Sequence, residues 1–216
     1  MTKPTHGVPS VLARFPHIPR RINDKLNARE CAAYHEAAHA VVGDYWALTV
    51  VEVTIVSAAV DKHIGRTKFE EIGPGDHAAK MDGIGYCEPY ERCNARDSFE
   101  AEVMKGIAGA IAEKMACGKL DHDGAEADYE AAITRLRHSL GAETDDELLP
   151  YFELLAVRTR DILDRKWLTV KRVAEALIDR GTLGAADFVA ICAAGPQPST
   201  DYRRLNAEVK RPVDWP

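Results

Sequence analysis

AYHEAAHAVVG, residues 33–43, is the stretch on which the interpretation of the whole chain depends. It holds two histidines, His35 and His39, and a glutamate, Glu36, directly after the first. In an α-helix, side chains at positions i and i+4 lie on the same face one turn apart, so the two imidazoles project side by side. The surrounding alanines and valines predict that this helix is buried on nearly all sides.

Two imidazoles in this arrangement can both reach one zinc ion, and the glutamate between them can reach a water molecule on it. The alternative is an ordinary helix that carries two histidines with no metal partner. Burial of three polar side chains among alanines and valines would be costly without such a partner. We therefore predict a zinc ion bound by His35 and His39, with Glu36 within reach of a water molecule on that ion.

A catalytic zinc ion needs a third protein ligand and one open position. The third ligand must come from elsewhere in the chain, and the candidates are His77, Glu113, His122 and Asp128. Asp128 lies near the predicted start of a helix, where free N–H groups keep a carboxylate ionised and fixed in position. An acid at this place is also typical of any helix start, so the residues alone leave the choice open.

The composition is typical of a soluble globular protein. Hydrophobic residues make up 46% of the chain and charged residues 29%, and the net charge of −6 does not favour binding to nucleic acid. No run of residues is apolar and long enough to span a membrane, and the Pro-rich first 25 residues lack the apolar core of a secretory signal. We therefore expect a cytoplasmic location.

The five cysteines are odd in number and form no CxxC pair. A disulfide framework is therefore not expected, and the thiols are predicted to be reduced. Cys87 and Cys93 lie near His77 in the sequence, which raises the alternative of a second zinc site. Their spacing fits no standard zinc finger, so this second site is disfavoured.

The hydrophobic pattern predicts a mainly α fold with a small β-sheet, an α+β class. We expect a Pro-rich N-terminal arm at 1–25, one domain at 26–195 and a C-terminal tail at 196–216. Three capping boxes are predicted, at Asn27 with Glu30, Asp97 with Glu100 and Thr144 with Glu147, and Gly118 is predicted to end a helix. A polar loop within 121–141 is expected to open into a helix whose first turn holds Asp128. The other expected helices lie at 27–46 and 98–117, from 144, and at 151–166, 168–180 and 182–192. Strands are expected at 51–57 and 64–70, and a long loop at 71–96.

Blocks of this sequence resemble, in order, the peptidase domain of the FtsH-type ATP-dependent zinc metalloproteases. The first is AYHEAAHAVVG, followed by VEVTIV and IGRTKFE. The later blocks are AGAIAEKMACG at 108–118, GAEADYEAAI at 124–133 and ILDRKWLTVKRVAEALIDRGTL at 162–183. The resemblance covers residues 26–192 and implies a zincin-like FtsH-type fold for the domain.

The resemblance also implies roles for individual residues. It implies that His35, His39 and Asp128 are the zinc ligands and that Glu36 is the catalytic acid/base. Glu113 is then expected to orient a ligating histidine rather than to bind the metal. The more polar strand, with Gly65, Arg66 and Thr67, is expected at a sheet edge, where it could hold an extended polypeptide by β-addition; the alternative is a plain edge strand.

Two hypotheses about function follow from this resemblance. The first is an active zinc metalloendopeptidase that hydrolyses peptide bonds in unfolded proteins or peptides, with water activated by zinc and Glu36. The alternative is a zinc-binding, protease-like subunit that docks on a separate ATPase or partner without cleaving on its own. The sequence contains no GxxxxGK[ST] phosphate-binding loop, and Ala38 stands where the family normally has glycine. The resemblance further implies a homo-oligomer, a hexamer in that family.

Overall fold

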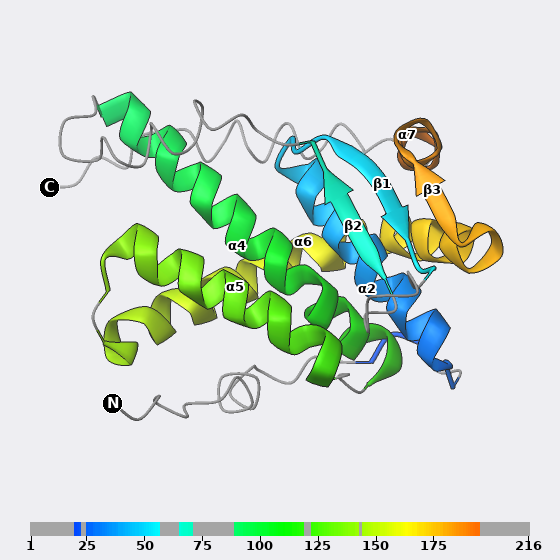
Figure 1. The fold of residues 1–216 in the computed structure, drawn as a ribbon, viewed down its shortest axis with the longest axis horizontal. Coiled ribbons are helices and arrows are strands. Elements are labelled where there is room, and N and C mark those ends of the chain that lie inside the picture. Colours follow the sequence, from blue (N-terminus) through cyan, green and yellow to red (C-terminus); the bar gives the residue numbers. More distant parts are fainter. Residues whose placement is uncertain are drawn as a thin grey trace, which may run out of the picture.

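The computed structural model describes residues 20–22, 25–56, 65–70, 89–118, 122–142 and 144–194, with the backbone alone for 89–98 and 122–124. The described part is mostly helical with one small antiparallel sheet (Figure 1), which agrees with the predicted α+β class. Among the described helices, none combines the length and the apolar character needed to cross a bilayer. The elements in chain order are α2 (Ala28–Tyr45), β1 (Val50–Thr54), β2 (Arg66–Phe69), α4 (Pro89–Cys117), α5 (His122–Leu140), α6 (Asp145–Arg180), β3 (Thr182–Gly184) and α7 (Ala185–Ala193).

Helix α2 is the centre of the fold. The predicted capping box at its start is present: the Asn27 side chain accepts from the Glu30 N–H at 3.0 Å, and the Glu30 carboxylate accepts from the Asn27 N–H at 2.7 Å. Residues 33–43 are all buried, because α2 packs against α4 and α6 and is covered by β1 and β2. The three polar side chains of the motif therefore lie inside the core, as its composition predicts.

The sheet has three strands in the order β2-β1-β3, and both pairings are antiparallel. Strand β2 is an edge strand among the described residues, as predicted. Strand β3 was not predicted, since residues 182–184 were assigned to the last helix. A strand of three residues is too short to show an alternating pattern, and it forms here because Gly181, at a φ of 79°, ends α6 and turns the chain toward β1.

Three helix predictions are wrong in their boundaries. The helix expected to start near Asp128 is α5, which begins at His122, so Asp128 lies inside the helix and not in its first turn. Helix α4 begins at Pro89 rather than near Asp97, so the end of the loop expected at 71–96 is helical, while 71–88 lie outside the described residues. Asp97 therefore lies inside the helix, and the prediction of a capping box from Asp97 and Glu100 is wrong. Proline suits a first helical position, where its missing N–H costs no hydrogen bond. The segments expected from 144 to 180 form one helix, α6, which continues through Pro150 because its neighbours Leu148, Phe152 and Leu155 are fully buried.

The prediction of reduced thiols is wrong for Cys31 and Cys117. These two residues form a disulfide between α2 and α4, with a sequence separation of 86. The pairing depends on how the two helices pack, which the spacing of cysteines along the chain does not reveal. Cys192 is a free thiol, and the disfavoured second zinc site, with Cys87, Cys93 and His77, lies outside the described residues.

Part of the predicted N-terminal arm contacts the domain. The Arg21 N–H donates to the Met115 carbonyl at 2.7 Å, and the Arg21 guanidinium pairs with Asp164 and lies over the ring of Trp167. Residues 20–22 therefore bridge the end of α4 and the middle of α6. Residues 1–19 of the predicted arm and the predicted tail at 196–216 lie outside the described residues.

Candidate metal centre

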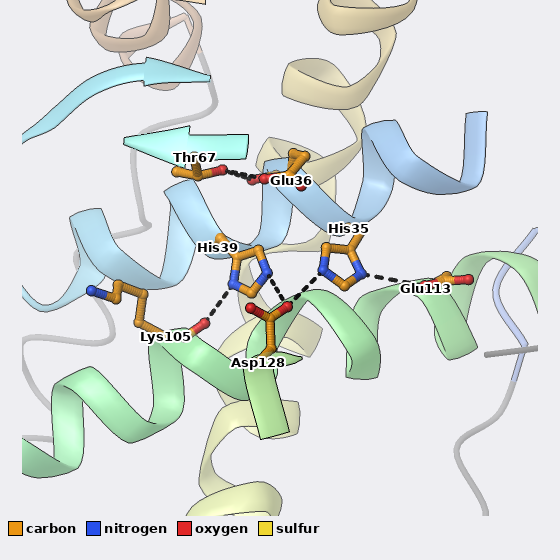
Figure 2. A network of polar contacts seen from close by, with 7 residues as sticks. All are labelled: His35, Glu36, His39, Thr67, Lys105, Glu113 and Asp128. Atoms are coloured by element: carbon orange, nitrogen blue, oxygen red, sulfur yellow. Dashed lines mark hydrogen bonds and ion pairs between the residues drawn. The ribbon is translucent and has the colours of Figure 1, made fainter. Parts of the chain in front are cut away.

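Three predicted ligands from two helices come together in the structure (Figure 2). His35 and His39 project from α2, and Asp128 projects from α5. Asp128 Oδ2 lies 3.0 Å from His35 Nε2 and 3.2 Å from His39 Nε2. One donor atom from each of the three residues lies within 4.8 Å of the other two, so all three could bind a single ion.

The other nitrogen of each imidazole is held by α4. His39 Nδ1 lies 2.7 Å from the backbone oxygen of Lys105, and His35 Nδ1 lies 3.3 Å from Glu113 Oε2. A carbonyl or carboxylate oxygen can only accept, so both Nδ1 atoms carry the hydrogen and donate. Both rings are therefore fixed with Nε2 directed to Asp128, as Figure 2 shows.

This arrangement tests whether the residues fit a cation. A neutral imidazole with its hydrogen on Nδ1 presents a lone pair at Nε2. Two such lone pairs facing one carboxylate oxygen repel it unless protons or a cation lie between them. Two imidazole nitrogens and one carboxylate oxygen are also a donor set that zinc accepts. The residues therefore fit a zinc ion.

The pKa shifts of His35 and Asp128 also indicate that these residues suit a cation. Burial would lower the pKa of His35, but its hydrogen bonds to Asp128 and then to Glu113 raise that pKa to about 10. Burial would raise the pKa of Asp128, but the hydrogen bonds from His35 and His39 hold it well below its usual range. Without a metal, positive charge is thus drawn to the point where the three side chains meet.

The side chains of the centre differ in their exposure to solvent. His35, Glu36 and His39 are only 7–8% exposed. The Asp128 side chain is 33% exposed. Among the three candidate ligands, Asp128 is therefore the one that is partly exposed to solvent.

Glu36 lies on the side of α2 that faces the sheet. Thr67 Oγ1 lies 2.8 Å from Glu36 Oε2 and 3.0 Å from the Glu36 backbone oxygen, so the hydroxyl donates to this residue. Figure 2 shows the carboxylate directed to Thr67 rather than to Asp128. A Cβ atom at Gly65 would lie 2.6 Å from both Cγ and Oε1 of Glu36, so a larger residue here would require the Glu36 side chain to shift.

The structure places the remaining predicted residues as follows. Arg66 points away from the centre and is exposed, with its guanidinium 3.7 Å from Glu52 Oε1 on β1. Glu113 contacts the Nδ1 side of His35, away from the Nε2 atoms. His77 and the side chain of His122, the other candidate ligands, lie outside the described residues.

Sequence reasoning missed two contributions to this site. The Lys105 carbonyl orients His39, and no sequence signal could reveal it because a backbone oxygen carries no residue identity. The contact between Thr67 and Glu36 was also missed, since it depends on the position of β2 over α2. The alternation of side chains along a strand places Gly65 and Thr67 on one face and Arg66 on the other. This alternation is the sequence signal that could have indicated a shared contact of Gly65 and Thr67.

No protein-family model matches the chain. The chain is similar to the ATP-dependent zinc metalloprotease FtsH of Rhodothermus marinus. The identity is 27% over an alignment 220 residues long, gaps included, and the alignment covers 83% of this chain. The chain spans only 28% of the length of that relative. The similarity indicates a distant relationship to FtsH.

Proposed function

We propose that this protein is a zinc metalloendopeptidase that hydrolyses peptide bonds in unfolded proteins or peptides. The observation that carries the proposal is the meeting of His35 Nε2, His39 Nε2 and Asp128 Oδ2 at one point, with Glu36 directly after His35 in the chain. The distant relationship to FtsH supports a protease at the level of the family. Residues 26–195 would form the peptidase domain, and a cytoplasmic location remains a prediction.

The metal would be held by His35, His39 and Asp128. When bound, zinc supplies a Lewis acid that lowers the pKa of a water molecule and polarises the scissile carbonyl. Glu113 and the Lys105 carbonyl accept from the two Nδ1 atoms and thereby keep each Nε2 lone pair available for the metal. The negative charge of Asp128 offsets part of the charge of the ion.

Glu36 would act as the general acid/base. Its carboxylate takes a proton from the attacking water and later delivers that proton to the leaving amine. In the described structure this carboxylate accepts from Thr67, so its action requires the side chain to turn toward the centre. An unbranched glutamate side chain can make this turn by rotation about its own bonds.

The substrate would bind along the edge strand. Strand β2 pairs with β1 on one side, and no other described strand pairs with its second side. An extended polypeptide can add to such an edge through backbone hydrogen bonds, which gives low sequence specificity. Gly65, Arg66 and Thr67 would contact this polypeptide, and the same segment lies against Glu36.

A protease assay with a chelator tests this proposal. The purified protein is incubated with an unfolded polypeptide such as casein, alone, with a zinc chelator, and with zinc added back. We expect cleavage that the chelator abolishes and zinc restores. Absence of cleavage by the zinc-loaded protein, or cleavage that survives complete removal of metal, would contradict the proposal.

A second candidate function is a zinc-binding subunit that works with a separate ATPase. This candidate rests on the similarity to FtsH, whose name describes an ATP-dependent protease. It predicts zinc binding without cleavage by the isolated chain. Native mass spectrometry would show whether copies of this chain assemble, with a hexamer as the expected size.

A further inference from the structure

Helices α2 and α4 face each other through contacts spaced about one turn apart. Cys31 is joined to Cys117, and the next contact joins His35 to Glu113. One turn further along, the space opposite His39 is occupied by Gly109, which has no side chain. The contact opposite the two Nε2 atoms is therefore made by backbone alone.

Gly109 has no conformational reason to be glycine. It lies inside α4, away from either helix end, and it does not have a positive φ. Glycine in a helix interior lowers stability relative to alanine. What glycine provides here is therefore the space that its missing side chain leaves.

That space lies between the two donor nitrogens. A Cβ atom on Gly109 would lie 2.4 Å from His39 Nε2 and 2.5 Å from both Nε2 and Cδ2 of His35. These atoms of the two imidazoles are the nearest neighbours of such a Cβ outside the adjacent part of α4 itself. Zinc binds imidazole nitrogen at about 2.0–2.1 Å, so a methyl group there would compete with an ion for the same region.

We propose that Gly109 is a positioning residue that keeps the space between His35 Nε2 and His39 Nε2 open for the metal ion. This inference rests on the metal centre of the proposed function and adds a residue to it. Gly106, one turn earlier on the same helix, is the matched comparison. A Cβ there would lie 3.6 Å from the Ala132 Cβ and 3.8 Å from the Asp128 backbone oxygen, which are ordinary contacts.

The first measurement is zinc affinity. Wild type, Gly109→Ala and Gly106→Ala are titrated with zinc against a chromophoric chelator, and circular dichroism checks that each is folded. We expect Gly109→Ala to bind zinc about 100-fold more weakly, at the upper end of what a supporting residue contributes, because the methyl group displaces the imidazoles. Gly106→Ala should bind as wild type does. A folded Gly109→Ala with wild-type affinity would overturn the inference.

The second measurement separates this role from helix packing and remains usable if Gly109→Ala does not fold. Gly109→Ala is compared in two metal-free backgrounds, the wild type and the His35→Ala, His39→Ala protein. We expect the substitution to lower the melting temperature in the first background. It should leave that temperature unchanged or raise it in the second, where the imidazoles are gone. An equal loss in both backgrounds would mean ordinary packing and would overturn the inference.

The failure of this inference is distinguishable from failure of the proposed function. Wild-type protein that takes up zinc but cleaves no peptide contradicts the peptidase, while the inference is still decided by the affinity of Gly109→Ala. Wild-type protein that takes up no zinc overturns the inference together with the metal centre.

Discussion

The two sides of α2 differ in how firmly they hold their polar groups. On the side facing α4 and α5, His35 and His39 make contacts with Asp128, Glu113 and the Lys105 carbonyl. On the side facing the sheet, the described contact of the Glu36 carboxylate is with one hydroxyl group, that of Thr67.

This difference matches what each side would have to do. A metal ligand must be fixed before the ion arrives, whereas an acid/base must move as the proton moves. One helix would thus carry metal binding on one side and proton transfer on the other. Substitutions on the two sides should therefore separate the two functions.

Glu36→Gln gives the sharpest separation and the largest expected effect. The amide keeps the size and the contact with Thr67 but cannot accept the proton of the attacking water. We expect cleavage of an unfolded peptide to fall about a thousandfold or more, while zinc content and melting temperature remain those of the wild type. Cleavage near the wild-type rate would refute the assignment of the base.

Asp128→Asn tests the opposite side, with Glu113→Gln as its matched comparison. Loss of the ligand charge should weaken zinc binding by more than the 10- to 100-fold that is typical of an orienting residue, which is the range we expect for Glu113→Gln. Metal analysis after dialysis measures both. If Glu113→Gln loses zinc and Asp128→Asn retains it, the two roles are reversed.

The disulfide affects both sides of α2 through the packing of α2 on α4. It closes a loop with a sequence separation of 86 and lies one turn from the contact between His35 and Glu113. We expect Cys31→Ser with Cys117→Ser to lower the free energy of unfolding by about 2–4 kcal/mol in a urea titration. Cys192→Ser, which removes a thiol that is free in the structure, is the control and should change it little. Equal stability of the two proteins would show that this bond does not form.

What the sequence could predict was mainly local. The start of α2, the burial of residues 33–43 and the end of α4 at Gly118 all follow from signals within a few residues, and the structure confirms them. The shared face of His35 and His39 follows from helix periodicity alone. Such features depend on neighbours along the chain, which a sequence displays directly.

The other features depend on packing between distant segments. Asp128 could be chosen among four candidate ligands only through the resemblance to a known family, because its distance from the histidines is set by the packing of α4 and α5 around α2. The Cys31–Cys117 pair and strand β3 were missed for the same reason. The early start of α4 was missed because a proline in a Gly-rich region is typical of a loop as well as of a first helical turn.

The smallest expected effect is on the sheet side of α2, at Gly65. A Cβ there would lie 2.6 Å from Cγ and Oε1 of Glu36, but those atoms belong to a flexible side chain that can move aside. Gly65→Ala should therefore leave the melting temperature and the zinc affinity nearly unchanged. It should reduce cleavage about tenfold, since the added methyl group restricts the rotation by which the Glu36 carboxylate would reach the attacking water.

Gly184→Ala is the matched control for Gly65→Ala, because a Cβ at this position in the same sheet meets no atom within 4 Å. Gly184→Ala should leave the melting temperature, the zinc affinity and the rate of cleavage unchanged. Gly65 and Gly184 correspond to Gly109 and Gly106 on the other side of α2. In each pair, a Cβ on the first glycine would meet a side chain of the candidate site, and a Cβ on the second would not. If Gly65→Ala weakened zinc binding as much as it weakened cleavage, Glu36 and the two histidines would behave as one unit, and the division between the two sides of α2 would be wrong.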